Sequence, residues 1–169
     1  MYNRLFLMFL SALSNYLVSI PNNNNVTFIT ENTYAQEYKE VMKIIIPKVD
    51  VNNNIYDYSS PLNNIDLNVS IMKESDLPDV ENGNVIIGAH SGYGPLAYFK
   101  KLNLIEIDDY VKIIYNDNTY NYRVVNKYLD EKDGSIYIRR NYNKNTLTLY
   151  TCNPNDKENF LVVICELEQ

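Results

Sequence analysis

The sequence has few of the residues that build metal sites and disulfide frameworks. Among its 169 residues are two cysteines, Cys152 and Cys165, and one histidine, His90. Two cysteines cannot make the several bridges of a disulfide-stapled domain, and a single bridge would consume the better nucleophile. One histidine and two cysteines 13 positions apart match no zinc-ligand spacing. We therefore expect free cysteines, no metal and no cofactor.

Positive charge is also scarce. Lysine and arginine number 15 against 21 aspartates and glutamates, which gives a formal net charge of −6. Binding to phosphate backbones needs a basic face, so nucleic acid is excluded as a partner. Four acidic residues gather at 74–81, and they form either a calcium loop or a solvated loop. Their irregular spacing favours the solvated loop.

Long hydrophobic runs are missing except near the N-terminus. Residues 5–20 are mostly apolar, and as a helix they would span about 24 Å of an about 30 Å hydrocarbon layer. We assign residues 1–25 as a signal or membrane-anchor leader ending in a polar break, 26–40 as a linker, and 41–169 as the folded domain. We expect a protein anchored by its N-terminal segment on the extracellular face of the cell membrane. The alternatives are a cleaved signal, which would give a secreted protein, and an amphipathic leader.

The rest of the chain reads as short strands separated by turn residues, with no repeat and no long amphipathic helix. We expect strands at residues 42–47, 65–71, 85–90, 111–115, 119–129, 146–152 and 160–167, and a short extended piece at 49–58 with a turn at 52–54. One or two helical turns are expected at 96–102 and a polar loop at 130–145. Strands of this length and spacing predict an all-β fold, a closed or nearly closed β-barrel.

Alternation in residues 146–152 predicts which side chains face the core. Successive strand residues point to opposite faces, so Leu147 and Leu149 share one face, and Thr148, Tyr150 and Cys152 share the other. The leucines are the expected core set. Cys152 should therefore open onto a groove walled by Thr148 and Tyr150. The same argument for residues 161–167 makes Cys165 a small core residue.

A cysteine and the lone histidine, each at a strand end, indicate a nucleophile with an acid–base partner. In this hypothesis Cys152 attacks a carbonyl carbon and forms a thioester. His90 protonates the leaving amine and later takes a proton from the incoming nucleophile. The plainer alternatives are a buried strand-end thiol and a structural histidine bonded to a loop carbonyl.

Several segments resemble the motifs of the sortase family. Thr148-Leu149-Tyr150-Thr151-Cys152 resembles the signature Thr-Leu-x-Thr-Cys, and residues 84–92 are similar to the segment that carries the sortase histidine. Weaker similarities occur in family order at residues 42–48, 75–78 and 98–102. Together they cover the chain from about residue 42 to residue 167.

The resemblance implies an eight-stranded sortase-like β-barrel with short helices and turns, over residues 41–169. It also implies a surface cysteine transpeptidase of Gram-positive type bacteria. Such an enzyme cleaves a Leu-Pro-x-Thr-Gly-like C-terminal sorting signal through a thioester, here on Cys152. It then transfers the protein to an amine of a peptidoglycan precursor or a pilin. His90 and Cys152 are the implied catalytic residues.

The sequence departs from the family at one position. Sortases carry an arginine at the start of the final strand, and here that position falls at Asn159 or Phe160. Loss of one donor to the oxyanion or substrate costs about 10²–10³ in rate. Groups from nearby segments could replace this donor: Lys157, Arg139, Arg140, and the Thr151 hydroxyl together with backbone N–H groups. Of these we favour Arg139 or Arg140. Arg123 is expected on an outer face.

Two other functions stay open from the sequence. A sortase-fold surface protein that binds peptide with weak or no turnover is favoured by the missing arginine. A cysteine hydrolase would release the acyl group to water instead of transferring it. Within the family, the sequence shows neither a lid insertion nor a C-terminal hydrophobic anchor of the kind typical of pilin polymerases, which favours an anchoring or specialised enzyme.

Overall fold

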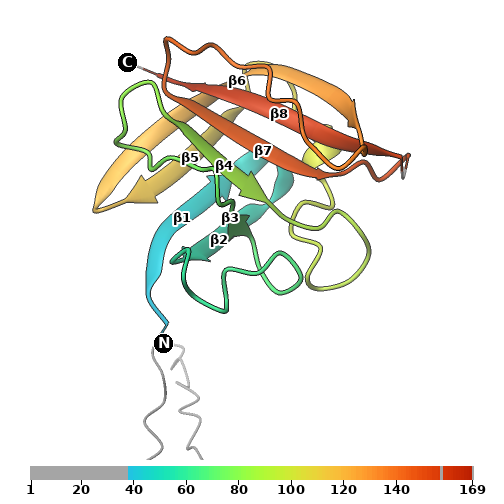
Figure 1. The fold of residues 1–169 in the computed structure, drawn as a ribbon, viewed down its shortest axis with the longest axis horizontal. Helices are drawn as coiled ribbons and strands as arrows, with labels where there is room; N and C mark the ends of the chain where they lie inside the picture. The colour runs from blue at the N-terminus through green and yellow to red at the C-terminus, as the bar shows by residue number, and fades with distance from the viewer. Residues whose placement is uncertain (1–37, 157, 169) are drawn as a thin grey trace, which may run out of the picture. The chain divides into compact units, whose positions relative to one another are not determined.

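The structure, a computed structural model, describes residues 38–156 and 158–168 as eight strands and two short 3-10 helices. The elements follow one another as β1 (Glu40–Ile46), η1 (Pro47–Val49), β2 (Val51–Tyr56), β3 (Ser70–Ile71), β4 (Asn84–Gly88), η2 (Leu102–Leu104), β5 (Tyr110–Tyr115), β6 (Asn118–Glu131), β7 (Thr146–Cys152) and β8 (Asn159–Leu167). They form one sheet in the order β2-β1-β5-β6-β8-β7-β4-β3 (Figure 1). The edge strands β2 and β3 contact each other, so the sheet is a nearly closed barrel. The predicted all-β, eight-stranded fold is confirmed.

The leader assigned to residues 1–25 and nearly all of the linker at 26–40 lie outside the described residues. Within the described part of the chain, no helix has the length and apolar character needed to cross a membrane.

One strand pairing differs from all the others. β4 and β7 pair in parallel, with Val85 opposite Leu147 and Gly88 opposite Tyr150, whereas the other pairings in the sheet are antiparallel. Figure 1 shows the two strands side by side and running in the same direction. Parallel neighbours end at the same edge of a sheet, because their chain directions agree. The residues that follow β4 therefore meet the end of β7.

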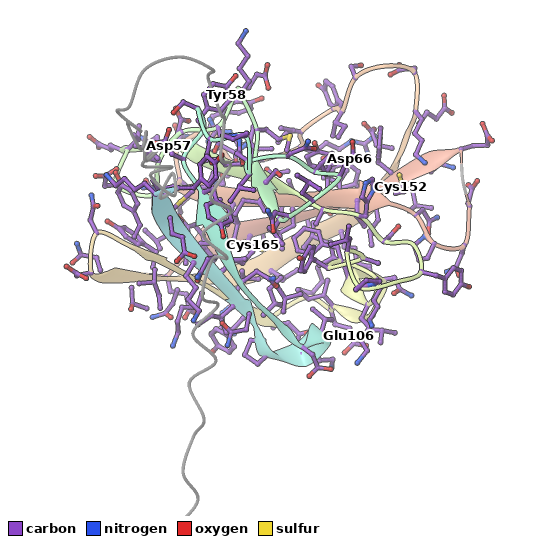
Figure 2. The ribbon with its side chains drawn as sticks, turned by 90° about the horizontal axis from the view of Figure 1, so that it is seen from below. Asp57, Tyr58, Asp66, Glu106, Cys152 and Cys165 are labelled. Carbon is purple, nitrogen blue, oxygen red and sulfur yellow. The ribbon has the colours of Figure 1, made fainter. Side chains whose placement is uncertain are left out.

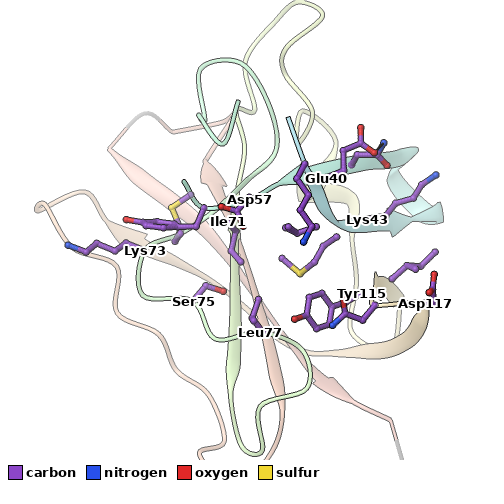
Figure 3. Close-up of a pocket in the computed structure, with 17 residues that line it drawn as sticks. Glu40, Lys43, Asp57, Ile71, Lys73, Ser75, Leu77, Tyr115 and Asp117 are labelled. Atoms are coloured by element: carbon purple, nitrogen blue, oxygen red, sulfur yellow. Dashed lines mark hydrogen bonds between the residues drawn. The ribbon is translucent and has the colours of Figure 1, made fainter. Parts of the chain in front are cut away.

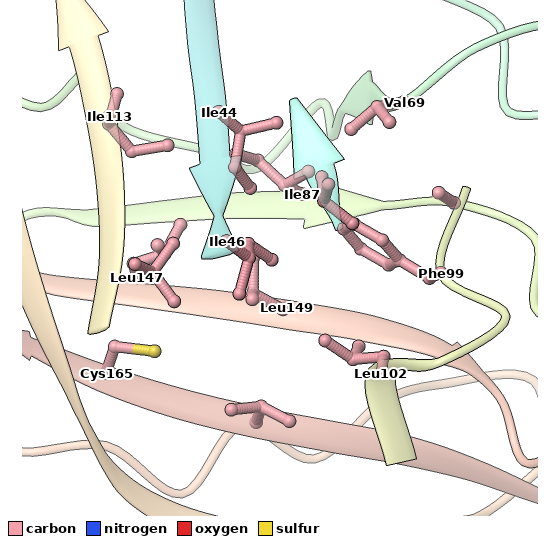
Figure 4. Packing of buried hydrophobic residues seen from close by; sticks show 14 of the residues in the cluster. Ile44, Ile46, Val69, Ile87, Phe99, Leu102, Ile113, Leu147, Leu149 and Cys165 are labelled. Carbon is pink, nitrogen blue, oxygen red and sulfur yellow. The ribbon is translucent and has the colours of Figure 1, made fainter. Parts of the chain in front are cut away.

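The inward faces of the strands form one hydrophobic core. Leu147 and Leu149 of β7 are fully buried in it, as their alternation predicts, and they pack with isoleucines of β1 and β4 (Figure 4). Cys165 of β8 is also fully buried there, which confirms it as a core residue. The core thus fixes which face of β7 stays open for chemistry.

Three local predictions need correction. The turn expected at 52–54 is part of β2, because these asparagines pair with β1. The strand expected at 65–71 is reduced to Ser70–Ile71, because the backbone before it forms turns in which the Leu67 and Asn68 N–H groups donate to the Asn64 carbonyl at 2.9 and 2.8 Å. Asn63 donates to the Ile71 carbonyl at 3.0 Å and accepts from its N–H at 2.9 Å. Such side-chain bonds compete with a sheet ladder. The helical turns expected at 96–102 are irregular turns followed by η2.

Candidate active site

Cys152 is the last residue of β7, and its side chain lies on the solvent side of the barrel. The preceding residue Thr151 points inward and is 2% exposed, whereas Cys152 is exposed. Asn153 and Pro154 follow and lead the chain out of the strand. The thiol is therefore accessible, and the alternative of a buried strand-end thiol is wrong.

Three hydrogen bonds hold the segment of His90 against the end of β7. The Ala89 N–H donates to the Tyr150 carbonyl at 3.4 Å, and the Thr151 hydroxyl donates to the Ala89 carbonyl at 2.6 Å. The Ser91 hydroxyl donates to the Cys152 carbonyl. Continuing the β4–β7 register by two residues sets His90 opposite Cys152. Neighbouring strands lie about 4.8 Å apart, so the backbones of the two predicted residues are neighbours at the end of β7.

The imidazole of His90 is partly exposed and contacts a carboxylate. Its Nε2 lies 3.0 Å from Asp66 Oδ1, and the side chains of His90 and Asp66 are 44% and 76% exposed. Figure 2 shows Asp66 in the same region as Cys152. The alternative of a structural histidine predicted a hydrogen bond to a loop carbonyl. The observed partner of His90 is the Asp66 carboxylate. Sequence reasoning missed Asp66, because nothing local connects it with a residue 24 positions away.

A groove of about 650 Å³ runs over the outer face of β4 and β7 beside this site. Thr148 and Tyr150 line it, as their strand parity predicts, and Cys152 is the next residue on that face. The segment between β6 and β7 forms the opposite wall. The lining is largely apolar and includes Met72, Ile86, Ile136, Ile138 and Phe160.

Tyr150 lies between the groove and β4, and a glycine makes room for it. Its hydroxyl donates to Met72 Sδ at 2.6 Å, and its ring meets the Phe160 ring edge-on with centroids 6.0 Å apart. Burial raises the pKa of the Tyr150 hydroxyl, with smaller contributions from the charges of Glu74 and Cys152. A Cβ on Gly88 would lie 2.7 Å from the Tyr150 ring, so only glycine permits this ring position.

Replacing Gly88 with alanine is therefore expected to displace the Tyr150 ring and reshape the groove. The added Cβ would clash with the rigid ring of Tyr150, and relief needs movement of the ring or the strand, so we expect destabilisation of about 1–3 kcal/mol. For a peptide substrate bound in the groove, KM should rise more than kcat falls. Thermal unfolding and steady-state kinetics measure both effects. The matched control is Gly92→Ala, where an added Cβ meets no atom within 4 Å. Equal KM values in the two variants would contradict the role of Gly88.

A larger cavity, of about 790 Å³, lies away from the cysteine and the histidine (Figure 3). The start of β1, β3 and the β5–β6 turn surround it, and its lining contains no cysteine or histidine. Charges of both signs mix there: Lys39, Lys43, Lys73, Glu40, Asp57 and Asp117. Because neither the cysteine nor the histidine lines it, this cavity is not the site of the cysteine chemistry, although it is the larger of the two.

Three of the four candidates for replacing the family arginine lie among the described residues, and they lie in different places. The Thr151 hydroxyl is buried and donates its proton to the Ala89 carbonyl. Arg139 stacks over the rings of Tyr128 and Tyr137, at 4.7 and 5.9 Å from their centroids. Each of these groups is engaged in holding the local structure.

Arg140 lies at the far end of β7 from Cys152. Its guanidinium donates to the Asn82 carbonyl at 2.9 Å and to the Thr146 hydroxyl at 3.2 Å. Thr146 begins β7 and Cys152 ends it, a separation of about 20 Å at about 3.3 Å per residue. The structure therefore does not bring Arg140 to the thiol, because the loop crosses the sheet at the start of the strand. Arg123, as expected, lies on an outer face, where it pairs with Glu168.

A different cation, Lys132, lies near the residue that pairs with Cys152 across β7 and β8. Phe160 of β8 pairs with Cys152, and Lys132 Nζ lies 5.2 Å from the centre of the Phe160 ring. Lys132 also lines the groove. The pKa of Asp156 is lowered by hydrogen bonds from the Glu158 N–H and the Asn159 amide, and further by the charge of Lys132. Sequence reasoning missed Lys132, since only the β6–β8 pairing reveals it. Lys157 lies outside the described residues.

No three histidine, cysteine, aspartate or glutamate side chains gather as a metal site among residues 38–156 and 158–168. Of the four acidic residues at 74–81, Glu74, Asp79 and Glu81 are exposed. Asp76 is half-buried and accepts from the Asn84 N–H at 2.8 Å.

Comparison with known families identifies the class of protein. The family described as the sortase domain matches residues 44–168, which is most of the chain. The chain belongs to the sortase family, whose members are cysteine transpeptidases. Comparison with curated proteins gives no match.

Solved structures of sortases share the fold. A lid mutant of sortase A from Corynebacterium diphtheriae is similar with a TM-score of 0.69 and 22% identity, over 83% of this chain and 76% of that one. Sortase C2 of pilus island 1 from Group B Streptococcus gives 0.69 and 20%, over 79% and 77%. The Clostridium perfringens sortase D5 transpeptidase gives 0.64 and 21%, over 79% and 83%. At these identities the likeness establishes the fold.

Proposed function

We propose that this protein is a sortase-type cysteine transpeptidase that acts through a thioester on Cys152. The observation that carries the proposal is the parallel pairing of β4 with β7, which sets His90 opposite an exposed cysteine beside a groove. A thiol nucleophile needs an acid–base partner at this position, and His90 is the only histidine of the chain.

In the first half-reaction the Cys152 thiolate attacks the carbonyl carbon of the scissile peptide bond. The C–S bond forms, the C–N bond breaks, and the imidazolium of His90 gives its proton to the leaving amine. In the second half-reaction an acceptor amine attacks the thioester carbonyl. The neutral imidazole takes the proton of that amine, and the thiolate leaves. The cycle returns the original charge state of the pair.

The groove fits an extended peptide with an apolar start. Ile86, Ile138 and Phe160 offer apolar contact area, and the Tyr150 ring lines the path to Cys152. Thr148 closes the floor of the groove, because it is buried and its hydroxyl donates to the Asn84 side-chain oxygen at 3.0 Å. A Leu-Pro-x-Thr-Gly-like sorting signal has apolar residues followed by a polar one ahead of its cleaved bond. Within this proposal the substrates are surface proteins that carry such a signal. The acceptor is an amine of a peptidoglycan precursor or of a pilin, and the N-terminal segment anchors the enzyme on the outer face of the membrane.

The test is a peptide assay with product masses. The protein is incubated with a library of C-terminal sorting peptides, with and without a glycine-based amine acceptor. Transfer is expected to give the mass of the acyl–acceptor conjugate and to depend on the acceptor. Cleavage that yields only the free acid in both arms would favour a hydrolase. Binding without cleavage would favour a sortase-fold peptide-binding protein. The lack of a cation at Asn159 or Phe160, where the family arginine falls, supports this alternative.

A further inference from the structure

The lone histidine of the chain has a carboxylate partner from a distant loop. His90 follows β4, and Asp66 lies in the segment between β2 and β3. The His90 Nε2 and the Asp66 Oδ1 are 3.0 Å apart, which is hydrogen-bond distance. Only the fold joins these two residues.

Asparagine side chains fix the turn that presents Asp66. The side-chain oxygen of Asn64 accepts from the Asp66 N–H at 2.9 Å. The Asn63 amide bonds to both the N–H and the carbonyl of Ile71, at 2.9 and 3.0 Å. Ile71 belongs to β3 and pairs with Ile87 of β4. The turn is thus fastened to the strand that leads to His90.

The loop after His90 contacts the same turn from the other side. The Tyr98 hydroxyl donates to the Leu67 carbonyl at 3.5 Å, and the Phe99 N–H donates to the His90 carbonyl at 2.9 Å. Asp66 and His90 are therefore positioned by backbone and side-chain bonds on both sides. These bonds hold the Asp66 carboxylate and the imidazole of His90 in place relative to each other.

The chemistry of the pair decides which ring nitrogen carries the proton. An ionised carboxylate only accepts hydrogen bonds, so His90 Nε2 must donate. In the neutral ring this leaves Nδ1 without a proton and with a free lone pair. A general base needs that lone pair to accept a proton.

We propose that Asp66 is a positioning residue for His90, holding the neutral ring in the tautomer with its proton on Nε2. Nδ1 then exchanges protons with Cys152 and with the reacting amines. The inference rests on the acid–base role proposed above for His90. Because both side chains are partly exposed, solvent screens the pair, and the expected effect is moderate.

The single histidine makes a direct spectroscopic test feasible. Full-length protein labelled with ¹⁵N-histidine gives one pair of imidazole nitrogen signals, read at about pH 8.5, where free imidazoles are neutral. The wild type should show one tautomer, protonated at Nε2. Asp66→Asn offers both an acceptor and a donor to the ring, so the nitrogen signals should move towards a tautomer average. Asp66→Glu keeps the carboxylate and should keep the wild-type pattern.

Kinetics with a cleaved sorting peptide provide the second readout. Asp66→Asn should lower kcat about three- to tenfold with KM unchanged, because the peptide groove is untouched. Asp66→Glu should retain most of the wild-type kcat. The matched control is Asp57→Asn, which makes the same charge change in the same loop. The Asp57 carboxylate accepts from the Ser59 N–H at 2.9 Å and should not affect His90.

The outcomes separate this inference from the proposed function. Unchanged nitrogen signals in Asp66→Asn would overturn the positioning role, whatever the activity. Equal falls in kcat for Asp66→Asn and Asp57→Asn would also overturn it. If the wild type turned over no peptide while the tautomer signals shifted as expected, the transpeptidase proposal would fail and the Asp66–His90 contact would stand.

Discussion

Cys152→Ala is expected to abolish peptide cleavage and transfer, a loss of at least about 10³-fold. The variant lacks the sulfur atom that forms the thioester, and a water molecule at that position would be a much weaker nucleophile than the thiolate. Mass spectrometry of the wild type mixed with a sorting peptide should show the acyl adduct on Cys152, and the variant should show none. Because the Cys152 side chain is exposed at the end of a strand, its replacement should change the free energy of unfolding little.

The matched control is Cys165→Ala. Burial raises the pKa of the Cys165 thiol, so this thiol stays protonated and unreactive at neutral pH, while Cys152 is open to solvent. A thiol-alkylating reagent should modify one site in the native protein and two after unfolding. Cys165→Ala should keep its activity and lose about 1 kcal/mol of stability through a small cavity. Turnover that survives Cys152→Ala, or native labelling at Cys165, would refute the assignment of the nucleophile.

His90→Ala is expected to lower kcat about 10²–10⁴-fold, the usual contribution of a positioned general acid–base group. The loss should fall mainly on kcat, since the imidazole does not line the groove. Both half-reactions need a proton transfer, so single-turnover acylation and thioester release should each slow down. Steady-state and single-turnover kinetics measure these effects.

Tyr93→Ala is the matched control for this variant. Tyr93 lies three residues after His90 in the same loop and is fully exposed, so its removal leaves the strand ends untouched. The Tyr93→Ala variant should cleave the sorting peptide at the wild-type rate. A His90→Ala variant with the wild-type rate would exclude the cysteine–histidine pair and support a histidine that serves the fold alone.

The local pattern of β7 was readable from the sequence because strand parity is a local property. Alternation in Thr146–Cys152 places the leucines in the core and Cys152 on the open face, and the structure agrees. The same logic identified Cys165 as a core thiol. The segment at 65–71 was mispredicted for an equally local reason. Its apolar residues favour a strand, but Asn63 and Asn64 bond the backbone and keep it in turns.

The position of Lys132, the cation beside the site, could not be predicted from local sequence. Proximity in sequence favoured Arg139 and Arg140, yet Arg140 is held at the start of β7 and Arg139 stacks on tyrosines. Lys132 reaches Phe160 because β6 and β8 pair along their length. Strand order decides such contacts, and strand order is not encoded in a single segment.

By itself, the sequence determined the set of strands, the face on which the cysteine lies, and the family. Only the tertiary structure decided that β4 and β7 run in parallel, so that the segment of His90 lies beside the end of β7, and that the β2–β3 loop brings Asp66 to the imidazole. The physical reason is the range of the interactions. Parity and turn chemistry act between neighbouring residues, whereas strand pairing depends on how the whole chain buries its hydrophobic faces.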